Sequence, residues 1–265
     1  MAPARLRSEV IARGAPRTTA GPWPFLEVCC EEDSAFGRLC EERGRPCLRI
    51  TKEVGSHRAA GVQAALNFLD DNLGADVWAA LPCTPWTSWS HVNEARLGPK
   101  FRAHLAWRQR QSLRMVKSAT LCIQAARSTG GHGHFEWPRR ARGWKRRAVL
   151  RMLSLLGMQL AFFDGCSFGV RASASLLARK PWTLATTHPG FAAVLRRYQC
   201  TGDHLHGALS GAWATRSGRY PDALCNVALD ALDVRPMQPR ARPRRHGLRA
   251  YSRHTLLCAA SALKG

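Results

Sequence analysis

The sequence predicts an α/β protein with a mostly parallel sheet and crossover helices on both faces. Short apolar runs of strand length alternate with longer segments whose apolar residues recur at helical spacing. Glycine follows several of the helical segments, as expected where helices end. Strands that alternate with helices pack as a parallel sheet, and 265 residues supply enough apolar material for one such domain.

Three strands are predicted in the first third of the chain. The first covers residues 25–29 within PWPFLEVCC, the second lies in PCLRIT, and the third lies in DVWAALPC. Between them, SAFGRLCEERG and VQAALNFLDDNLG have the spacing of amphipathic helices and end at Gly44 and Gly74. This alternation is what a parallel sheet with crossover helices requires.

The remainder of the domain is predicted to continue the pattern. Residues 102–127 are the longest helical pattern, and HGHFEWP after them is a further strand. The segment RRARGWKRRAVLRMLSLLG predicts a basic amphipathic helix that ends at Gly157. Two more strands are expected in MQLAFFDGCSFGV and KPWTLATTHP. A turn-rich segment and a last short helix in DALCNVALDAL follow.

We divide the chain into three parts. Residues 1–22 form a basic leader that is expected to be disordered and is compatible with an organelle transit peptide. Residues 23–234 form the α/β domain, and residues 235–265 form an Arg/Pro-rich basic tail. No apolar run reaches the length of a bilayer crossing. We therefore expect an intracellular protein with no membrane partner, in the nucleus in preference to an organelle.

The charge of the chain points to a polyanionic partner. Lys and Arg number 40 against 18 Asp and Glu, a net charge of +22, and the isoelectric point is near 11.0. Such a surplus attracts nucleic acid through its phosphates, and we expect DNA in preference to RNA. The densest basic segment is residues 139–151. We expect it to bind phosphates; the alternative is that it is an ordinary solvated helix face. Its expected phosphate-binding residues are Arg139, Arg140, Arg142, Lys145, Arg146 and Arg147.

The segment VWAALPCTPWTSW contains the best candidate nucleophile. Its apolar residues predict a buried strand, and Cys83 follows that strand between two prolines. A thiol on a stiff loop at the carboxyl end of a strand lies where open α/β sheets bind their ligands. The alternative is that Cys83 is a small buried residue in a turn.

Five short patches, taken in order, resemble the cytosine-5 DNA methyltransferases. The likeness is closer still to methyltransferase-like segments in retroelement-derived reading frames of dinoflagellate algae. FLEVCC resembles the family's Asp-Leu-Phe-x-Gly opening through Glu27, LPCTPW its Pro-Cys-Gln-Pro-Phe loop through Cys83, and FEWP its Glu-Asn-Val patch through Glu136. FGVR resembles the Gly-Val-Pro-Gln-x-Arg patch through Arg171, and CNVA resembles the closing Gly-Asn-Ala-Val through Asn226.

This resemblance implies a Rossmann-like, S-adenosylmethionine-dependent methyltransferase domain over residues 23–234. Cys83 would add to C6 of cytosine, a carboxylic acid at Glu136 would bond N3, and Arg171 would complete the catalytic set. The target base would be flipped out of a duplex or presented single-stranded. The resemblance places four residues around S-adenosylmethionine: Glu27, Cys29, Glu53 and Asn226.

The chain departs from the family's pattern at the cofactor loop. The family has a glycine-rich loop after the first strand, which lets the backbone approach the cofactor. This chain has Glu31-Glu32-Asp33-Ser34 there. We therefore expect a poorer S-adenosylmethionine pocket than the family has.

Two further functions remain open. The same fold could serve a mobile element as a non-catalytic nucleic-acid-binding module. Alternatively, His132-Gly-His134 or Cys200-x3-His204-x-His206 could supply zinc ligands to an interaction protein. Because no Cys-x2-Cys pair occurs, we assign no metal ligand. The oligomeric state is left open.

Overall fold

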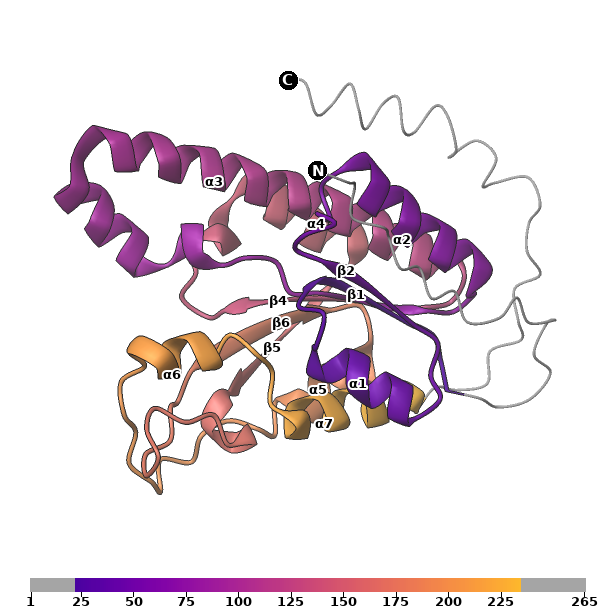
Figure 1. Cartoon of the computed structure of the whole chain (residues 1–265). Helices are drawn as coiled ribbons and strands as arrows, with labels where there is room; N and C mark the ends of the chain where they lie inside the picture. Colours follow the sequence, from indigo (N-terminus) through magenta and orange to yellow (C-terminus); the bar gives the residue numbers. More distant parts are fainter. Residues whose placement is uncertain (1–21, 235–265) are drawn as a thin grey trace, which may run out of the picture.

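The computed structural model describes residues 22–234 as a single sheet between two layers of helices (Figure 1). The expected tail at 235–265 lies outside the described residues, and so does the expected leader at 1–22 apart from Pro22. Each predicted strand segment contains one strand. The six strands are β1 (Phe25–Cys30), β2 (Cys47–Thr51), β3 (Asp76–Ala79), β4 (Gly133–Pro138), β5 (Gln159–Asp164) and β6 (Pro181–Thr186).

The sheet is mixed, so the prediction of a mostly parallel sheet is wrong. Its strand order is β2-β1-β3-β4-β6-β5. The neighbours from β2 to β4 pair in parallel, whereas β6 pairs antiparallel with both β4 and β5. The reason lies between β5 and β6, where the chain forms only the short 3-10 turn η3 (Gly165–Phe168) and an irregular loop. Without a crossover helix, the two strands join as antiparallel neighbours.

Helices cover both faces of the sheet, as predicted. The α-helices are α1 (Ala35–Glu42), α2 (Ala59–Asp71), α3 (Ser88–Ser128), α4 (Arg147–Leu156), α5 (Pro189–Leu195), α6 (Gly211–Arg216) and α7 (Asp222–Asp233). Figure 1 shows α2, α3 and α4 on one face and α1, α5 and α7 on the other. None of the helices between residues 22 and 234 combines the length and the hydrophobicity that a bilayer crossing requires.

Four helical segments differ from the prediction. Helix α6 lies in the segment expected to be turn-rich and was not predicted, since it has only 6 residues. Helix α3 begins at Ser88, well before the predicted start, and bends at Gly98, whose φ of 73° and following Pro99 interrupt the helical backbone. The predicted basic helix is split, because the turn η2 (Arg142–Lys145) precedes α4. Helix α5 was not predicted, since it has only 7 residues. Its start is set by Pro189 and by His188, whose ring accepts a hydrogen bond from the backbone of Phe191.

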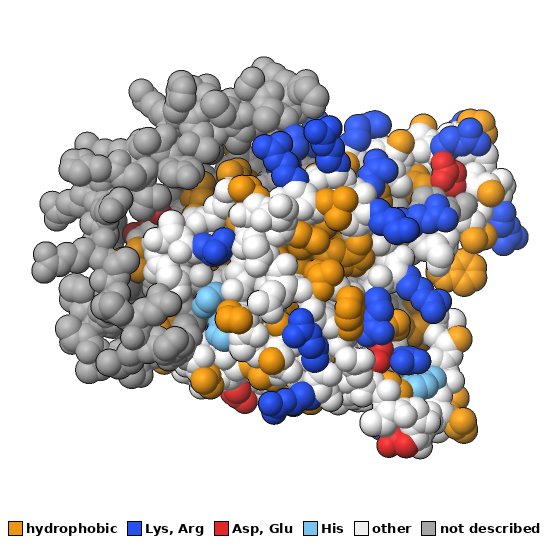
Figure 2. Space-filling model, turned by 180° about the vertical axis from the view of Figure 1, so that it is seen from behind, with side chains coloured by type: hydrophobic (Ala, Val, Ile, Leu, Met, Phe, Trp, Pro, Cys, Tyr) orange, Lys and Arg blue, Asp and Glu red, His pale blue; other side chains and the backbone are white. Residues whose placement is uncertain are grey.

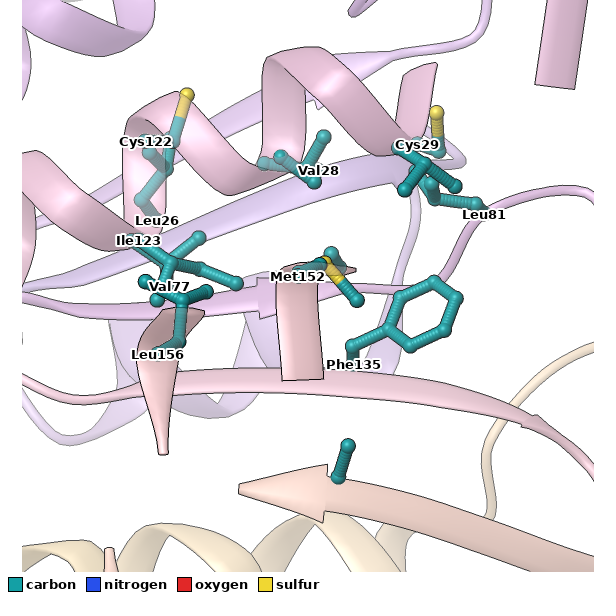
Figure 3. Packing of buried hydrophobic residues seen from close by; sticks show 14 of the residues in the cluster. Leu26, Val28, Cys29, Val77, Leu81, Cys122, Ile123, Phe135, Met152 and Leu156 are labelled. Atoms are coloured by element: carbon teal, nitrogen blue, oxygen red, sulfur yellow. The ribbon is translucent and has the colours of Figure 1, made fainter. Parts of the chain in front are cut away.

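Two hydrophobic cores lie on opposite faces of the sheet. Figure 3 shows the first, in which side chains of the central strands, such as Val77 and Phe135, meet Ile123 and Met152 from the covering helices. The second core is rich in aromatic rings and includes Trp78. Because both faces are covered, the polar chemistry of the domain is confined to the edges of the sheet.

The strand order produces a switch point between β1 and β3. The chain leaves β1 to form β2 on one side, then crosses back over β1 to form β3 on the other. The connections from the carboxyl ends of these two strands therefore run in opposite directions. Ligands of open α/β sheets bind at such a point.

One test of this packing concerns Gly133, which lies on β4 beneath α3. A Cβ at this position would fall 2.1 Å from Cγ2 of Ile123. Gly133→Ala should therefore lower the free energy of unfolding by about 1–3 kcal/mol. Ile123→Ala should cost about 2–5 kcal/mol by leaving a cavity.

The double variant should be destabilised by less than the sum of the two single effects, because the new methyl group partly fills the space that Ile123 leaves. Urea unfolding of the four proteins measures this coupling. Strictly additive effects would contradict the described packing of β4 against α3.

Candidate active site

Cys83 lies on a loop that two tryptophans hold in place. The backbone carbonyl of Leu81, just after β3, accepts a 2.7 Å hydrogen bond from the indole of Trp137 on β4. The indole of Trp86 donates a 2.8 Å bond to Ser112 on α3. Cys83 itself begins the turn η1 (Thr84–Trp86), and its carbonyl accepts a bond from the backbone of Trp86. The half-buried thiol is therefore presented on a fixed loop beyond the carboxyl end of β3.

Glu136 on β4 is a buried carboxyl with a single hydrogen-bond donor. The hydroxyl of Tyr220 donates to its Oε2 at 2.6 Å, whereas its buried Oε1 has no hydrogen-bond partner. Burial raises the pKa of Glu136 to about 7, against smaller lowering effects of Tyr220 and Lys180. A carboxyl with such a pKa is substantially protonated at neutral pH, and its free oxygen can then donate a hydrogen bond.

Lys180 is the cation of this site, and the sequence patterns did not reveal it. Its ammonium donates to the carbonyl of Ser217 and lies 4.9 Å from the ring centre of Trp182. Its backbone has a φ of 34°, a left-handed conformation that residues with side chains rarely adopt. Burial lowers the pKa of Lys180, and the negative charges of Glu136 and Cys83 oppose that lowering. The only sequence signal was a lysine at the start of an apolar strand.

The thiol of Cys83, the carboxyl of Glu136 and the ammonium of Lys180 act on one another electrostatically. Burial raises the pKa of Cys83 to about 11, the carboxylate of Glu136 raises it further, and Lys180 lowers it. The thiol therefore keeps its proton at neutral pH in the free protein. The site holds a latent nucleophile, an acid of near-neutral pKa and a cation, all at the carboxyl edge of β3 and β4.

Arg171, assigned to the catalytic set by its sequence patch, lies elsewhere. It is exposed in the loop between β5 and β6 and donates a 2.8 Å bond to the carbonyl of Ala174 in the same loop. The patch places it near Lys180 in the chain, but its guanidinium is turned toward its own loop. Lys180, in contrast, is a cation that acts electrostatically on Cys83 and Glu136.

The expected S-adenosylmethionine residues are occupied by other contacts. Glu27 is only 2% exposed, and its Oε2 accepts a 2.5 Å bond from Ser34, the residue that caps α1. Cys29 is buried, and its sulfur lies 2.9 Å from the hydroxyl of Ser56. Its backbone has the left-handed φ of 66°, at the start of the loop where the family uses glycine. Both side chains are therefore buried and already engaged within the protein.

Two other expected cofactor residues lie apart from this loop. Glu53 is fully exposed in a turn. Asn226 on α7 accepts a 2.6 Å bond from Arg43, which ends α1, and therefore lies toward the opposite edge of the sheet. The acids of the loop after β1 are also engaged, since Arg219 pairs with Glu31 and Asp33. These residues do not fit S-adenosylmethionine, as the missing glycines had indicated.

A basic hollow lies beside the Cys83 loop. Its volume is ≈ 390 Å³, which is within the usual range of small-ligand sites. It is lined by Trp86, Glu94, Arg102, Leu105, Ala106, Gln109, Arg142, Lys145 and Arg146. Four of these residues are cationic. Figure 2 shows Lys and Arg side chains gathered over the part of the molecule formed by α3, with few acidic side chains among them.

The six basic residues expected to bind phosphate do not share one role. Arg142, Lys145 and Arg146 line the hollow, and the guanidinium of Arg146 lies 5.4 Å from the ring centre of Trp86. Arg140 and Arg147 are exposed to solvent near it in the chain. Arg139 instead points to the sheet, where it donates to the carbonyl of Phe163 at 3.2 Å and pairs with buried Asp164. We therefore regard Arg139 as structural.

No protein-family model matches the sequence, and no curated protein or solved structure is significantly similar to it. The likeness to the cytosine-5 DNA methyltransferases therefore rests on the short patches described above. The site has to be interpreted from its own geometry and chemistry.

The pKa of Cys83 tests the electrostatic coupling. Glu136→Gln removes a negative charge and should lower this pKa, whereas Lys180→Met removes a positive charge and should raise it, each by about one unit. The measurement is the rate of iodoacetamide alkylation of Cys83 between pH 8 and 11, followed by mass spectrometry of its peptide.

Glu27→Gln is the matched control, because Glu27 is an equally buried carboxyl whose pKa is also raised to about 7. It should leave the Cys83 titration unchanged. Equal shifts in the Glu27 and Glu136 variants would show that the effect is not local to the site.

Proposed function

We propose that this protein acts on cytosine in nucleic acid by covalent addition of Cys83 to the base. The proposal includes a Rossmann-like fold related to that of the cytosine-5 DNA methyltransferases. One observation carries it: Cys83, Glu136 and Lys180 lie close enough to act on one another electrostatically at the carboxyl edge of the sheet, beside its switch point. Mixed sheets with an antiparallel strand toward one side are common in doubly wound folds, so β6 does not argue against this architecture.

The three groups match the demands of the addition step. The thiolate of Cys83 would form a bond to C6, and the electrons of the C5–C6 double bond would move toward N3. The protonated carboxyl of Glu136 would supply a proton at N3 and relieve the developing charge. Lys180 would stabilise the thiolate before attack. The result is an adduct with a nucleophilic C5.

Release of the base requires no further cofactor. The nucleophilic C5 would take a proton from solvent, and loss of the original C5 hydrogen as a proton would expel the thiolate of Cys83 from C6 and restore the C5–C6 double bond. The proton at N3 would return to Glu136, which regenerates both the base and the acid. The net outcome is exchange of the C5 hydrogen with water. The residues expected around S-adenosylmethionine do not fit that cofactor, so the proposed reaction includes no methyl transfer. The protein would be a relative of the methyltransferases in which the cofactor loop has been replaced.

The basic hollow supports nucleic acid as the carrier of the base. Its cations Arg142, Lys145 and Arg146 lie beside Trp86, which follows Cys83 closely in the chain. Phosphates bound there would place a flipped or single-stranded base near the thiol. The guanidinium of Arg146 lies 5.4 Å from the ring centre of the buried Trp86, which helps to hold this cation beside the Cys83 loop.

Hydrogen exchange tests the catalytic part of the proposal. Single-stranded DNA of mixed sequence, containing every tetranucleotide context, is incubated with the protein in deuterium oxide and then digested to nucleosides. Deoxycytidine should gain deuterium at C5, as measured by mass spectrometry. Cys83→Ser should abolish the gain, and Glu136→Gln should lower it by about 10²-fold or more.

Cys47→Ser is the matched control, since Cys47 is another half-buried free thiol. It should exchange at the wild-type rate. If the protein binds this DNA but deuterium uptake matches that of Cys83→Ser, the catalytic proposal fails and the non-catalytic binding module remains. That second function is favoured by the raised pKa of Cys83, which leaves little thiolate in the free protein.

The salt dependence of DNA binding tests the hollow. Replacing Arg142, Lys145 and Arg146 together by Gln should reduce the slope of log K against log salt. The reduction should be roughly 0.9 for each phosphate that the protein no longer neutralises on duplex DNA, and roughly 0.7 on single strands. Fluorescence anisotropy with a labelled oligonucleotide at several salt concentrations gives the slope.

A charge-matched triple variant on the other helical layer, with Arg196, Arg197 and Arg216 replaced by Gln, is the control. It should change the slope less than the variant of the hollow. If the two triple variants have equal slopes, the hollow is not the nucleic-acid surface.

A further inference from the structure

Four metal-ligating side chains converge in the loops beyond β5. They are Cys166, Cys200, His204 and His206, and one ligand atom from each lies within 4.8 Å of all the others. The sulfur of Cys200 is 3.8 Å from Nε2 of His204 and 3.5 Å from Nε2 of His206. A tetrahedral zinc ion with sulfur at about 2.3 Å and nitrogen at about 2.1 Å holds those two ligand atoms about 3.6 Å apart.

We propose that these four residues form a structural zinc site. Two thiolates with two imidazoles are a donor set that suits zinc, whereas calcium and magnesium prefer oxygen. All four tetrahedral positions come from the protein. A closed site of this kind leaves no position for a reacting water, so its role is structural. This inference is independent of the function proposed for Cys83.

Neighbouring groups hold the ligands in the orientation that a metal requires. Nδ1 of His204 lies 2.7 Å from a carboxylate oxygen of Asp203, which fixes the ring and directs Nε2 toward the cluster. The backbone of Gly202 donates to the sulfur of Cys200 at 3.4 Å, and the backbone of Cys200 donates to Asp164 at 3.0 Å.

The location explains why a metal would be useful. Residues 199–210 contain no helix or strand, and Leu205 within them is 80% exposed. Apolar packing against the second core is provided only near the end of this segment, by Leu209. Cys166 comes from η3, after β5, and the other three ligands come from the segment after α5. These loops lie together at the lower left of Figure 1. Zinc would join them as a cross-link.

The same cross-link would support the candidate active site from a distance. His206 forms a bridge with Leu177, and the backbone of Gly207 donates to Leu177 at 2.8 Å. Lys180 follows three residues later in the same loop, and its partner Ser217 follows the zinc-binding segment. The zinc site would therefore hold both the loop that contains Lys180 and the segment that leads to its partner Ser217.

No metal ligand was assigned from the sequence, because no Cys-x2-Cys pair occurs. Cys200, His204 and His206 are close in the chain, but Cys166 lies far before them and joins them only through the fold. The other histidine pair considered, His132 and His134, is engaged differently. Nδ1 of His134 lies 2.9 Å from the hydroxyl of Thr186, and the ring of His132 lies against another histidine ring.

Metal analysis of the untagged full-length protein tests the proposal. Plasma mass spectrometry of protein expressed with zinc and dialysed against metal-free buffer should find about one zinc ion per chain. The double variant Cys166→Ser/Cys200→Ser should contain only background zinc. Asp203→Asn should weaken zinc affinity about tenfold or more. Cys47→Ser, which changes a half-buried thiol elsewhere, should retain the wild-type content.

A second measurement on the unaltered chain does not depend on the folding of any variant. Cys166 and Cys200 should resist alkylation in the zinc-loaded protein and become reactive after a chelator removes the metal, as mapped by peptide mass spectrometry. A wild-type protein that neither contains nor takes up zinc would overturn the proposal. So would zinc content that the double variant retains, or a Cys166–Cys200 disulfide in protein prepared under reducing conditions.

Discussion

The candidate active site depends on the burial of Glu136 beneath an aromatic cluster. The ring of Tyr220 packs edge-on against Trp78, with centroids 5.7 Å apart, and lies 6.1 Å from Trp182. These rings exclude water from the carboxyl, and the hydroxyl of Tyr220 supplies its single hydrogen bond. The environment therefore disfavours the carboxylate and favours the acid. Without this aromatic cover, Glu136 would be an ordinary ionised side chain.

The fold places the nucleophile beside this acid by means of strand pairing. Strands β3 and β4 are parallel neighbours, so the segments that follow them leave the sheet at the same edge. The hydrogen bond from the indole of Trp137 to the carbonyl of Leu81 links β4 directly to the segment that follows β3. Lys180 reaches the same place because β6 runs antiparallel to β4 and begins at the edge where β4 ends. The reversal of β6, which the sequence did not predict, is thus what brings the cation to the thiol.

Local sequence patterns predicted the elements well but predicted the partners of side chains poorly. Apolar runs and glycine stops located all six strands found in residues 22–234, because those signals lie within a few residues. The direction of β6 depends on how a loop packs, which periodicity does not encode. Lys180 and Tyr220 carry no local motif, and their roles arise from contacts between distant segments. Asn226 matched its sequence patch, yet its helix faces Arg43 instead of the site.

The pH at which Glu136 loses its proton tests the proposed site most directly. Carbon-13 NMR of the side-chain carboxyl, assigned with the help of Glu136→Gln, follows its titration in the folded protein. The account predicts a midpoint at a pH of about 7. A midpoint near the ordinary value of 4.5 would show a solvated carboxylate, and it would contradict both the buried acid and the chemistry proposed for Cys83.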